Sequence, residues 1–265
     1  MSKVLLNYLK NKLLICQSNK YIIFKVLVII SSIVFSLCID KDHLIKYFKS
    51  FLQKNISNKA LLDIFDFFRK LSMKSYPGNL ENNIQNFEKN HLEEIRRNKG
   101  YIEDQYMYSD MKYGLKTIEF SGCEIIAVYN AINDLTGEEN KNFPQMIDYF
   151  EKDGILLYGL FGTTPLAIEK FFNELEYETM SSTKREDYAN IQNHCDTFIL
   201  TIYNDVEDIM AMIHTVNISK KDGKYFVHNN GENENLIEYD SIIDVVVKIN
   251  NGKSKDIFLI GIKNK

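Results

Sequence analysis

The sequence predicts an α+β fold, in which a helix that carries a cysteine packs on an antiparallel sheet and further helices precede both. Two observations support this class. A capped apolar helix is predicted between Ser121 and Gly137, and two strands joined by a tight turn are predicted at residues 210–218 and 224–229.

The predicted helix places a thiol in its first turn. Ser121 and Glu124 have the spacing of a capping box, residues 125–132 are largely apolar, and Gly137 ends the segment. Cys123 then stands at about the second helical position. Because free N–H groups and the positive end of the helix dipole meet there, we expect a lowered thiol pKa and a reactive cysteine.

A reactive thiol needs a base from elsewhere in the chain. The sequence contains five histidines: His43, His91, His194, His214 and His228. His214 has the most suitable setting because it lies within the predicted strand at 210–218, next to the predicted hairpin.

The hairpin determines what lies beside that histidine. A turn at 220–223 brings the chain back, so Asn229 or Asn230 should lie next to His214. A side-chain amide there would accept a hydrogen bond from the imidazole and fix its tautomer. Strand alternation favours Asn229, which shares a face with Val227, but both asparagines remain candidates.

A helix-borne cysteine followed by a histidine and an asparagine on adjacent strands resembles the papain-like cysteine peptidases, in particular their bacteriocin-processing, double-glycine branch. That branch has a short helix, a Gly-Thr-x-Pro-like turn that opens another helix, and a strand between cysteine and histidine. The corresponding stretches here are residues 143–150, 162–168 and 197–203. The similarity covers residues 113–263 and implies a papain-like fold.

The resemblance implies a cysteine peptidase or related thiol-dependent amide hydrolase that acts on a peptide or protein substrate without a cofactor or metal. His214 would take the proton of Cys123, the thiolate would attack a carbonyl, and Asn229 (or Asn230) would orient the imidazole. The family usually has an oxyanion-hole glutamine six residues before the cysteine. Thr117 stands there, so its hydroxyl is the candidate donor.

Two other functions fit the same residues. Loss of one oxyanion-hole donor reduces turnover by about 100- to 1000-fold, so a weak or inactive membrane-anchored binding or immunity-type protein is one alternative. A cell-wall peptide amidase is the other. Its relatives often use a second histidine, which His228 would supply only if the hairpin register slipped by one residue.

Composition and motifs exclude several classes of function. A formal net charge of -4 with 26% charged residues gives no indication of nucleic-acid binding, and the glycines form no phosphate-binding loop. The four cysteines, Cys16, Cys38, Cys123 and Cys195, have no disulfide-framework or zinc spacing. Neighbours in an extended segment point to opposite faces, so His194 and Cys195 are not expected to share a metal.

An apolar stretch at residues 22–39 has the length of a membrane span, and Lys25 near its start can snorkel toward the headgroups. No small-residue cleavage site follows, which favours an uncleaved single-pass anchor over a signal peptide. A helix buried in a soluble N-terminal bundle is the alternative. Lysines are balanced on the two sides, so the sequence does not predict which side of the membrane the rest occupies.

These observations predict three regions: residues 1–40 with the anchor, residues 41–110 as a helical linker or stalk, and residues 111–265 as the catalytic domain. Amphipathic helices are expected in the linker at 59–68 and 80–95, separated by a turn at 75–79.

Overall fold

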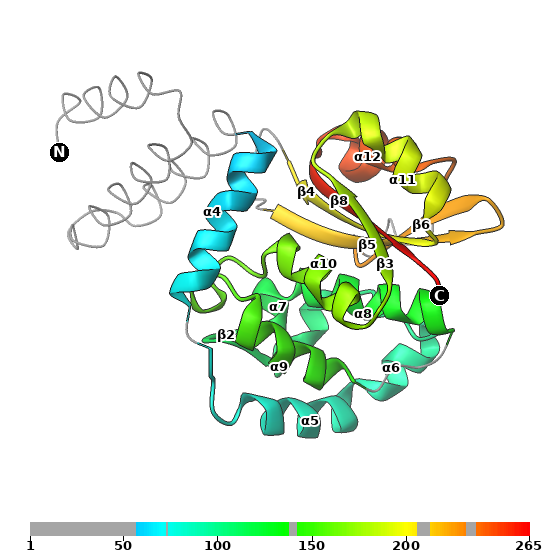
Figure 1. Ribbon diagram of the computed structural model, residues 1–265. Coiled ribbons are helices and arrows are strands. Elements are labelled where there is room, and N and C mark those ends of the chain that lie inside the picture. Colours follow the sequence, from blue (N-terminus) through cyan, green and yellow to red (C-terminus); the bar gives the residue numbers. More distant parts are fainter. Residues whose placement is uncertain (1–56, 73, 138–141, 206–212, 232–236) are drawn as a thin grey trace, which may run out of the picture. The chain divides into compact units, whose positions relative to one another are not determined.

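The computed structural model describes residues 57–72, 74–137, 142–205, 213–231 and 237–265 (Figure 1). The chain divides between Ile64 and Phe65, and residues 65–265 form the compact unit that contains the sheet and the candidate site. This unit combines helices with antiparallel strands, so the predicted α+β class is confirmed.

The predicted linker segments are helical. Helix α4 (Asn58–Leu71) covers the first, and the second is divided into α5 (Asn79–Asn90) and α6 (Leu92–Arg97) by a break at His91. Gly78 precedes α5 as its N-cap with φ 87°, a conformation that glycine adopts without strain. The anchor predicted at 22–39 lies outside the described residues. Within the described ranges, none of the helices has the length and apolar character needed to cross a bilayer.

A short two-stranded sheet and a succession of helices lead into the main sheet. The short sheet pairs β1 (Lys112–Tyr113) with β2 (Lys116–Thr117). The helices that precede the main sheet are α7 (Ile118–Ser121), α8 (Cys123–Thr136), α9 (Phe143–Asp153) and α10 (Pro165–Glu174). Two further helices lie between strands of the main sheet: α11 (Tyr188–His194) and α12 (Ile242–Lys248). The helices predicted at 143–150 and after the Pro165 turn are thus confirmed as α9 and α10.

The main sheet has six strands in the order β3-β8-β4-β5-β6-β7, and all neighbours are antiparallel. The strands are β3 (Glu178–Ser182), β4 (Thr197–Tyr203), β5 (Ile213–Lys221), β6 (Lys224–His228), β7 (Glu238–Tyr239) and β8 (Lys255–Lys263). Strand β4 has the bounds predicted for it and is buried throughout. Asp222 and Gly223 both have positive φ between β5 and β6, which confirms the predicted hairpin.

The two faces of the sheet carry different layers. In Figure 1, α11 and α12 lie on one side of the sheet and α8 and α10 on the other. Val216 and Ile218 of β5 join the apolar cluster of α11 and α12, whereas Asn217 donates to Asp134 of α8 at 3.0 Å. Alternate residues of β5 therefore serve opposite layers.

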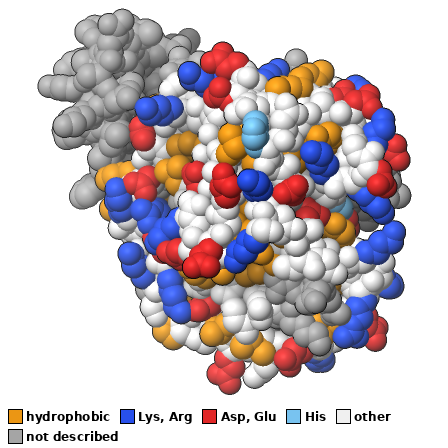
Figure 2. Space-filling model, turned by 45° about the vertical axis from the view of Figure 1, so that its right-hand side comes forward, with side chains coloured by type: hydrophobic (Ala, Val, Ile, Leu, Met, Phe, Trp, Pro, Cys, Tyr) orange, Lys and Arg blue, Asp and Glu red, His pale blue; other side chains and the backbone are white. Residues whose placement is uncertain are grey.

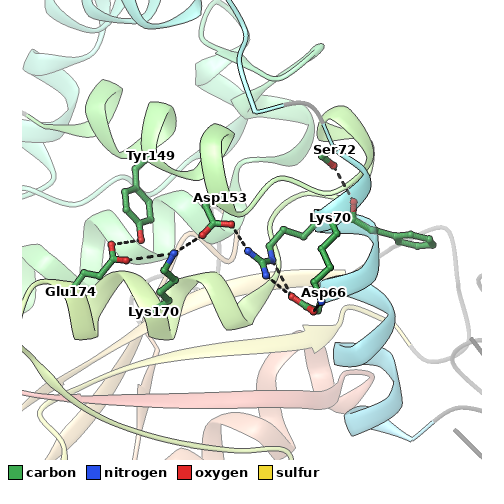
Figure 3. A network of polar contacts seen from close by, with 9 residues as sticks. Asp66, Lys70, Ser72, Tyr149, Asp153, Lys170 and Glu174 are labelled. Atoms are coloured by element: carbon green, nitrogen blue, oxygen red, sulfur yellow. Dashed lines mark hydrogen bonds and ion pairs between the residues drawn. The ribbon is translucent and has the colours of Figure 1, made fainter. Parts of the chain in front are cut away.

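Charged side chains of both signs lie on the face of the molecule seen in Figure 2. Figure 2 shows Lys and Arg intermixed with Asp and Glu on the face that it presents, with small apolar areas between them. One chain of ion pairs links the end of α4 to α9 and α10 (Figure 3). Arg69 bridges Asp66 and Asp153, and Lys170 contacts Asp153 at 2.5 Å. These contacts tie elements that are far apart in the sequence.

Candidate functional site

Cys123 is the first residue of α8, and the N-cap is Gly122. The predicted capping box is wrong: Ser121 belongs to α7, and its buried Oγ has no hydrogen-bond partner among the described residues. The reason is local. Residues 118–121 already form a helical turn, so Ser121 lacks the extended backbone of an N-cap. The predicted end is confirmed, since Gly137 closes α8 with φ 65°.

The Cys123 thiol is enclosed. Its side chain belongs to a residue that is 7% exposed, and Sγ donates to Oε2 of Glu124 at 3.3 Å. Burial raises the pKa of the thiol well above its usual value, and the Glu124 charge adds to this, while a hydrogen bond with the Thr215 backbone acts in the opposite direction. The expectation of a lowered pKa is therefore wrong, because burial and a neighbouring carboxylate outweigh the helix N-terminus.

Glu124 is a component of the site that the sequence reasoning had assigned only to capping. It is buried, and burial raises the pKa of its carboxyl to about 7. Its carboxylate lies against the turn before α10: it accepts a hydrogen bond from the Thr163 backbone, and a Cβ on Gly162 would lie 2.8 Å from Oε2. No sequence pattern marks this contact, because the turn is about forty residues away.

His214 is near the start of β5, opposite Ile202 of β4. Its Nε2 lies 2.6 Å from the backbone carbonyl oxygen of Asn229. A carbonyl can only accept, so Nε2 carries the hydrogen and the neutral ring presents Nδ1 as a base. Burial lowers the pKa of His214, which keeps the imidazole neutral at neutral pH.

Cys123 of α8 lies next to the β5 residue that follows His214. The backbone of Thr215, the residue after His214, is near enough to Sγ to act on the thiol, and it lowers the thiol pKa. No hydrogen bond joins Sγ to the imidazole within the described part of the chain. Strand alternation explains this, because Thr215 shares a face with Asn217, which bonds to α8, whereas His214 shares a face with Val216.

Asn229 holds His214 in a way that differs from the expected contact. It has φ 60° and lies just beyond the end of β6 at His228, so it is not part of the strand. Its carbonyl oxygen, not its side chain, accepts from His214. Its Oδ1 accepts instead from the Gln105 backbone at 3.0 Å. Asn230 is directed elsewhere, with Nδ2 at 3.4 Å from Oδ1 of Asn250.

Two residues of the segment that precedes β1 support this corner, and the sequence reasoning missed both. One oxygen of Glu103 accepts from the Asn229 backbone N–H at 3.1 Å, and the other contacts Nδ1 of His228 at 2.7 Å. Gln105 donates through Nε2 to the carbonyls of Ile118 and Glu119 in α7. They lie in an irregular segment and a short 3₁₀ turn, which carry no periodic pattern to reveal them.

Thr117, the candidate oxyanion donor, is the N-cap residue of α7, and its side chain makes no capping hydrogen bond with the described residues. It is partly exposed, and its backbone ends β2. Its hydroxyl therefore remains a candidate donor.

His228 belongs to a polar cluster on the α8 face of the sheet that shares Glu103 with Asn229. Nε2 lies 2.8 Å from Ser219 Oγ, Nδ1 contacts Glu103, and the ring stacks on Tyr101 with centroids 3.9 Å apart. The order serine, histidine, carboxylate is that of a hydrolytic relay. Ser219, however, is buried within the ladders to β4 and β6, so this cluster cross-links the sheet to the segment before β1.

The other histidines and cysteines have separate surroundings. His91 pairs with Asp110 and stacks on Tyr108. His194 contacts its own helix, and Cys195 is buried with a pKa raised to about 11, chiefly by burial. The described residues contain no group of three or more potential metal ligands. His43, Cys16 and Cys38 lie outside the described ranges.

A scan against protein-family models, a search of curated proteins and a search of solved structures each return no match for this chain.

Proposed function

We propose that this chain is a cysteine peptidase or related thiol-dependent amide hydrolase, with a papain-like arrangement of its helix and sheet. Cys123 is the nucleophile and His214 the base. One observation supports this most strongly. Nε2 of His214 is hydrogen-bonded to the Asn229 carbonyl, so Nδ1 is left as a proton acceptor. His214 is also the residue before Thr215, whose backbone acts on the Cys123 thiol.

The proposed reaction begins with both groups neutral. Nδ1 of His214 receives the thiol proton as Sγ attacks the carbonyl carbon of a peptide bond, and the imidazolium then protonates the leaving amine. Water, deprotonated by the same nitrogen, hydrolyses the thioester. His214 shares a face with Val216, so this step requires its imidazole to turn toward the α8 face. The hydrogen-bonded ladder between β5 and β6 ends at Asn217 and His228, so β6 does not pair with β5 at His214 and does not fix the strand there.

The oxyanion would be stabilised by the backbone N–H of Cys123 at the start of α8, with the Thr117 hydroxyl as the second proposed donor. Asn229 would fix the tautomer through its carbonyl, and Asn230 stays the alternative orienting residue. The proposed hydrolysis requires no cofactor.

The second candidate function is a non-catalytic binding or immunity-type protein that keeps the same fold. The enclosed thiol favours it, because burial raises the thiol pKa and no hydrogen bond joins Cys123 to His214 in the described structure. A cysteine of this kind is usually a small buried residue.

We also propose that residues 22–39 anchor the chain in a membrane as a single span, on the basis of the apolar sequence alone. The substrate would then be a peptide or protein at a membrane surface. Attaching a reporter to the chain with and without residues 1–40 and measuring its sedimentation with membranes tests this: the proposal requires membrane association that the truncation abolishes.

Acyl transfer tests the hydrolase. The full-length chain is mixed with p-nitrophenyl acetate as a general acyl donor, and acetylation of Cys123 and Cys195 is followed by peptide mass spectrometry. We expect an acetyl thioester on Cys123 that forms and then hydrolyses. In His214→Ala the thioester should persist roughly 100-fold longer, because the group that activates water is gone.

Cys123→Ser is the matched control, since it places a hydroxyl donor beside Glu124 and removes the thiol. If Cys123 acetylates no faster than the buried Cys195, the hydrolase is wrong and the binding protein remains.

A further inference from the structure

The side chain that is bonded to the Cys123 thiol is a carboxyl group. Sγ lies 3.3 Å from Oε2 of Glu124, and both residues are buried at the start of α8. Neighbouring helical residues ordinarily point in different directions, so this contact requires that the Glu124 side chain folds back toward the helix start.

The turn before α10 holds the carboxylate in that position. The Thr163 backbone hydrogen-bonds to it, and a Cβ on Gly162, which has φ 71°, would lie 2.8 and 2.9 Å from its two oxygens. Thr163 is itself fixed, because its Oγ1 lies 2.7 Å from the hydroxyl of Tyr113. The Glu124 carboxylate is thus held between the turn at Gly162 and Thr163 and the Cys123 thiol.

The titratable groups near Cys123 and Glu124 are neutral at neutral pH, so none of them takes the thiol proton in place of Glu124. Tyr113 of β1 is fully buried, which raises its phenol pKa and keeps it neutral, and Glu151 of α9 acts on Tyr113 in the same direction. His214 of β5 is neutral at neutral pH because burial lowers its pKa. Burial raises the Glu124 pKa to about 7, the nearest to neutrality among these groups.

We propose that Glu124 is a catalytic residue that exchanges one proton directly with the Cys123 thiol, so that the two side chains titrate as a coupled acid–base pair. This rests on the proposed thiol chemistry at Cys123. It makes Glu124, in place of His214, the group that takes up the thiol proton and returns it to the leaving amine, and it leaves His214 the activation of water for thioester hydrolysis. The S–H bond breaks, its proton passes to Oε2, and the sulfur electron pair forms the bond to the carbonyl carbon. The protonated carboxyl then returns that proton to the departing amine.

A coupled pair has a distinctive pH profile. Below neutral pH the thiolate fraction rises with pH. Once Glu124 has lost its proton, its charge opposes a second ionisation, so the thiolate fraction stays nearly constant over a range above about pH 7. An uncoupled thiol instead rises continuously up to its own pKa.

The test is the second-order rate of iodoacetamide labelling of Cys123 between about pH 5 and pH 10 in the full-length chain, with peptide mass spectrometry separating Cys123 from Cys195. Wild type should show a break near pH 7 followed by a plateau. Glu124→Gln, which keeps the side-chain shape, should lose the break and label at least about tenfold faster than wild type near pH 9, because the opposing charge is absent. His214→Ala should keep the break.

Two results would overturn the assignment. A break that survives in Glu124→Gln and disappears in His214→Ala would make His214 the proton partner and leave the proposed hydrolase intact. A Cys123 that labels no faster than Cys195 at any pH would remove the reactive thiol, and with it both proposals. Glu124→Asp guards against misfolding, because a shorter carboxylate should restore the break in a correctly folded chain.

Discussion

Nε2 of His214 lies 2.6 Å from the backbone carbonyl oxygen of Asn229, so the imidazole is oriented by main chain rather than by a side-chain amide. A carbonyl acceptor is independent of residue type, provided that the backbone keeps its conformation. Asn229 has φ 60°, which asparagine and glycine tolerate and other residues rarely adopt. The residue at 229 therefore acts through its backbone geometry.

Substitution of Asn229 tests this directly. Asn229→Gly keeps the carbonyl and the left-handed conformation, whereas Asn229→Ala adds the strain of a Cβ, about 1–2 kcal/mol. Both lose the bond to the Gln105 backbone. We expect Asn229→Ala to unfold in less urea than Asn229→Gly, and the glycine variant to retain hydrolysis of the Cys123 thioester. Equal loss of hydrolysis in both would show that the side chain is what matters.

Glu103 should be needed to place that carbonyl. Its two oxygens contact the Asn229 N–H and the His228 ring, so Glu103→Ala removes both contacts and leaves buried donors unpaired. The expected loss of unfolding free energy is roughly 2–3 kcal/mol, measured by urea denaturation. Glu119→Ala is the control, because it removes a partly exposed carboxylate in α7. It should change the free energy of unfolding by less than about 0.5 kcal/mol. A loss in the control as large as that in Glu103→Ala would show a general effect of removing a carboxylate.

The sequence carries the regular elements of this fold more clearly than its site. The Asp222-Gly223 turn and the apolar run of β4 are local signals, and both elements appear where they were predicted. The position of Glu124 depends on the turn at Gly162, and the bond at Asn229 depends on a left-handed residue that ends β6. The burial that raises the Cys123 pKa is also tertiary, so a helix N-terminus alone did not predict it.

Glu151 gives a pH dependence of stability with a definite sign. Burial raises its pKa from 4.5 to about 7, although Asn79 and the Gly114 backbone donate to it. Because the native carboxyl binds its proton more tightly than the unfolded one, stability from this group falls as pH rises from about 4.5 to 7 and stays reduced above. Glu151→Gln should therefore raise the unfolding free energy at pH 8 by at most about 3 kcal/mol, and this gain should vanish below about pH 4.

Urea denaturation at several pH values measures this gain. Glu186→Gln is the control, since Glu186 forms an exposed surface pair with Lys184 and its loss should change stability by no more than about 0.5 kcal/mol at either pH. A Glu151→Gln variant whose difference from wild type is the same at pH 4 and pH 8 would contradict the coupling of this carboxyl to folding.

A side chain at Gly162 should destabilise the protein in two ways, through backbone strain and through a clash with Glu124, and the two costs can be measured separately. Gly162→Ala places a Cβ within 3 Å of both Glu124 oxygens at φ 71°, whereas Gly223→Ala at φ 76° meets no atom within 4 Å. Both variants bear the left-handed strain of about 1–2 kcal/mol, so Gly223→Ala measures that strain alone. We expect Gly162→Ala to lose additional stability in urea and, because the carboxylate must leave Sγ, to lose the break in Cys123 labelling near pH 7. If both alanine variants lose equal stability and keep the break, the turn before α10 does not hold the carboxylate on the thiol, and the position of Glu124 must be set by α8 itself.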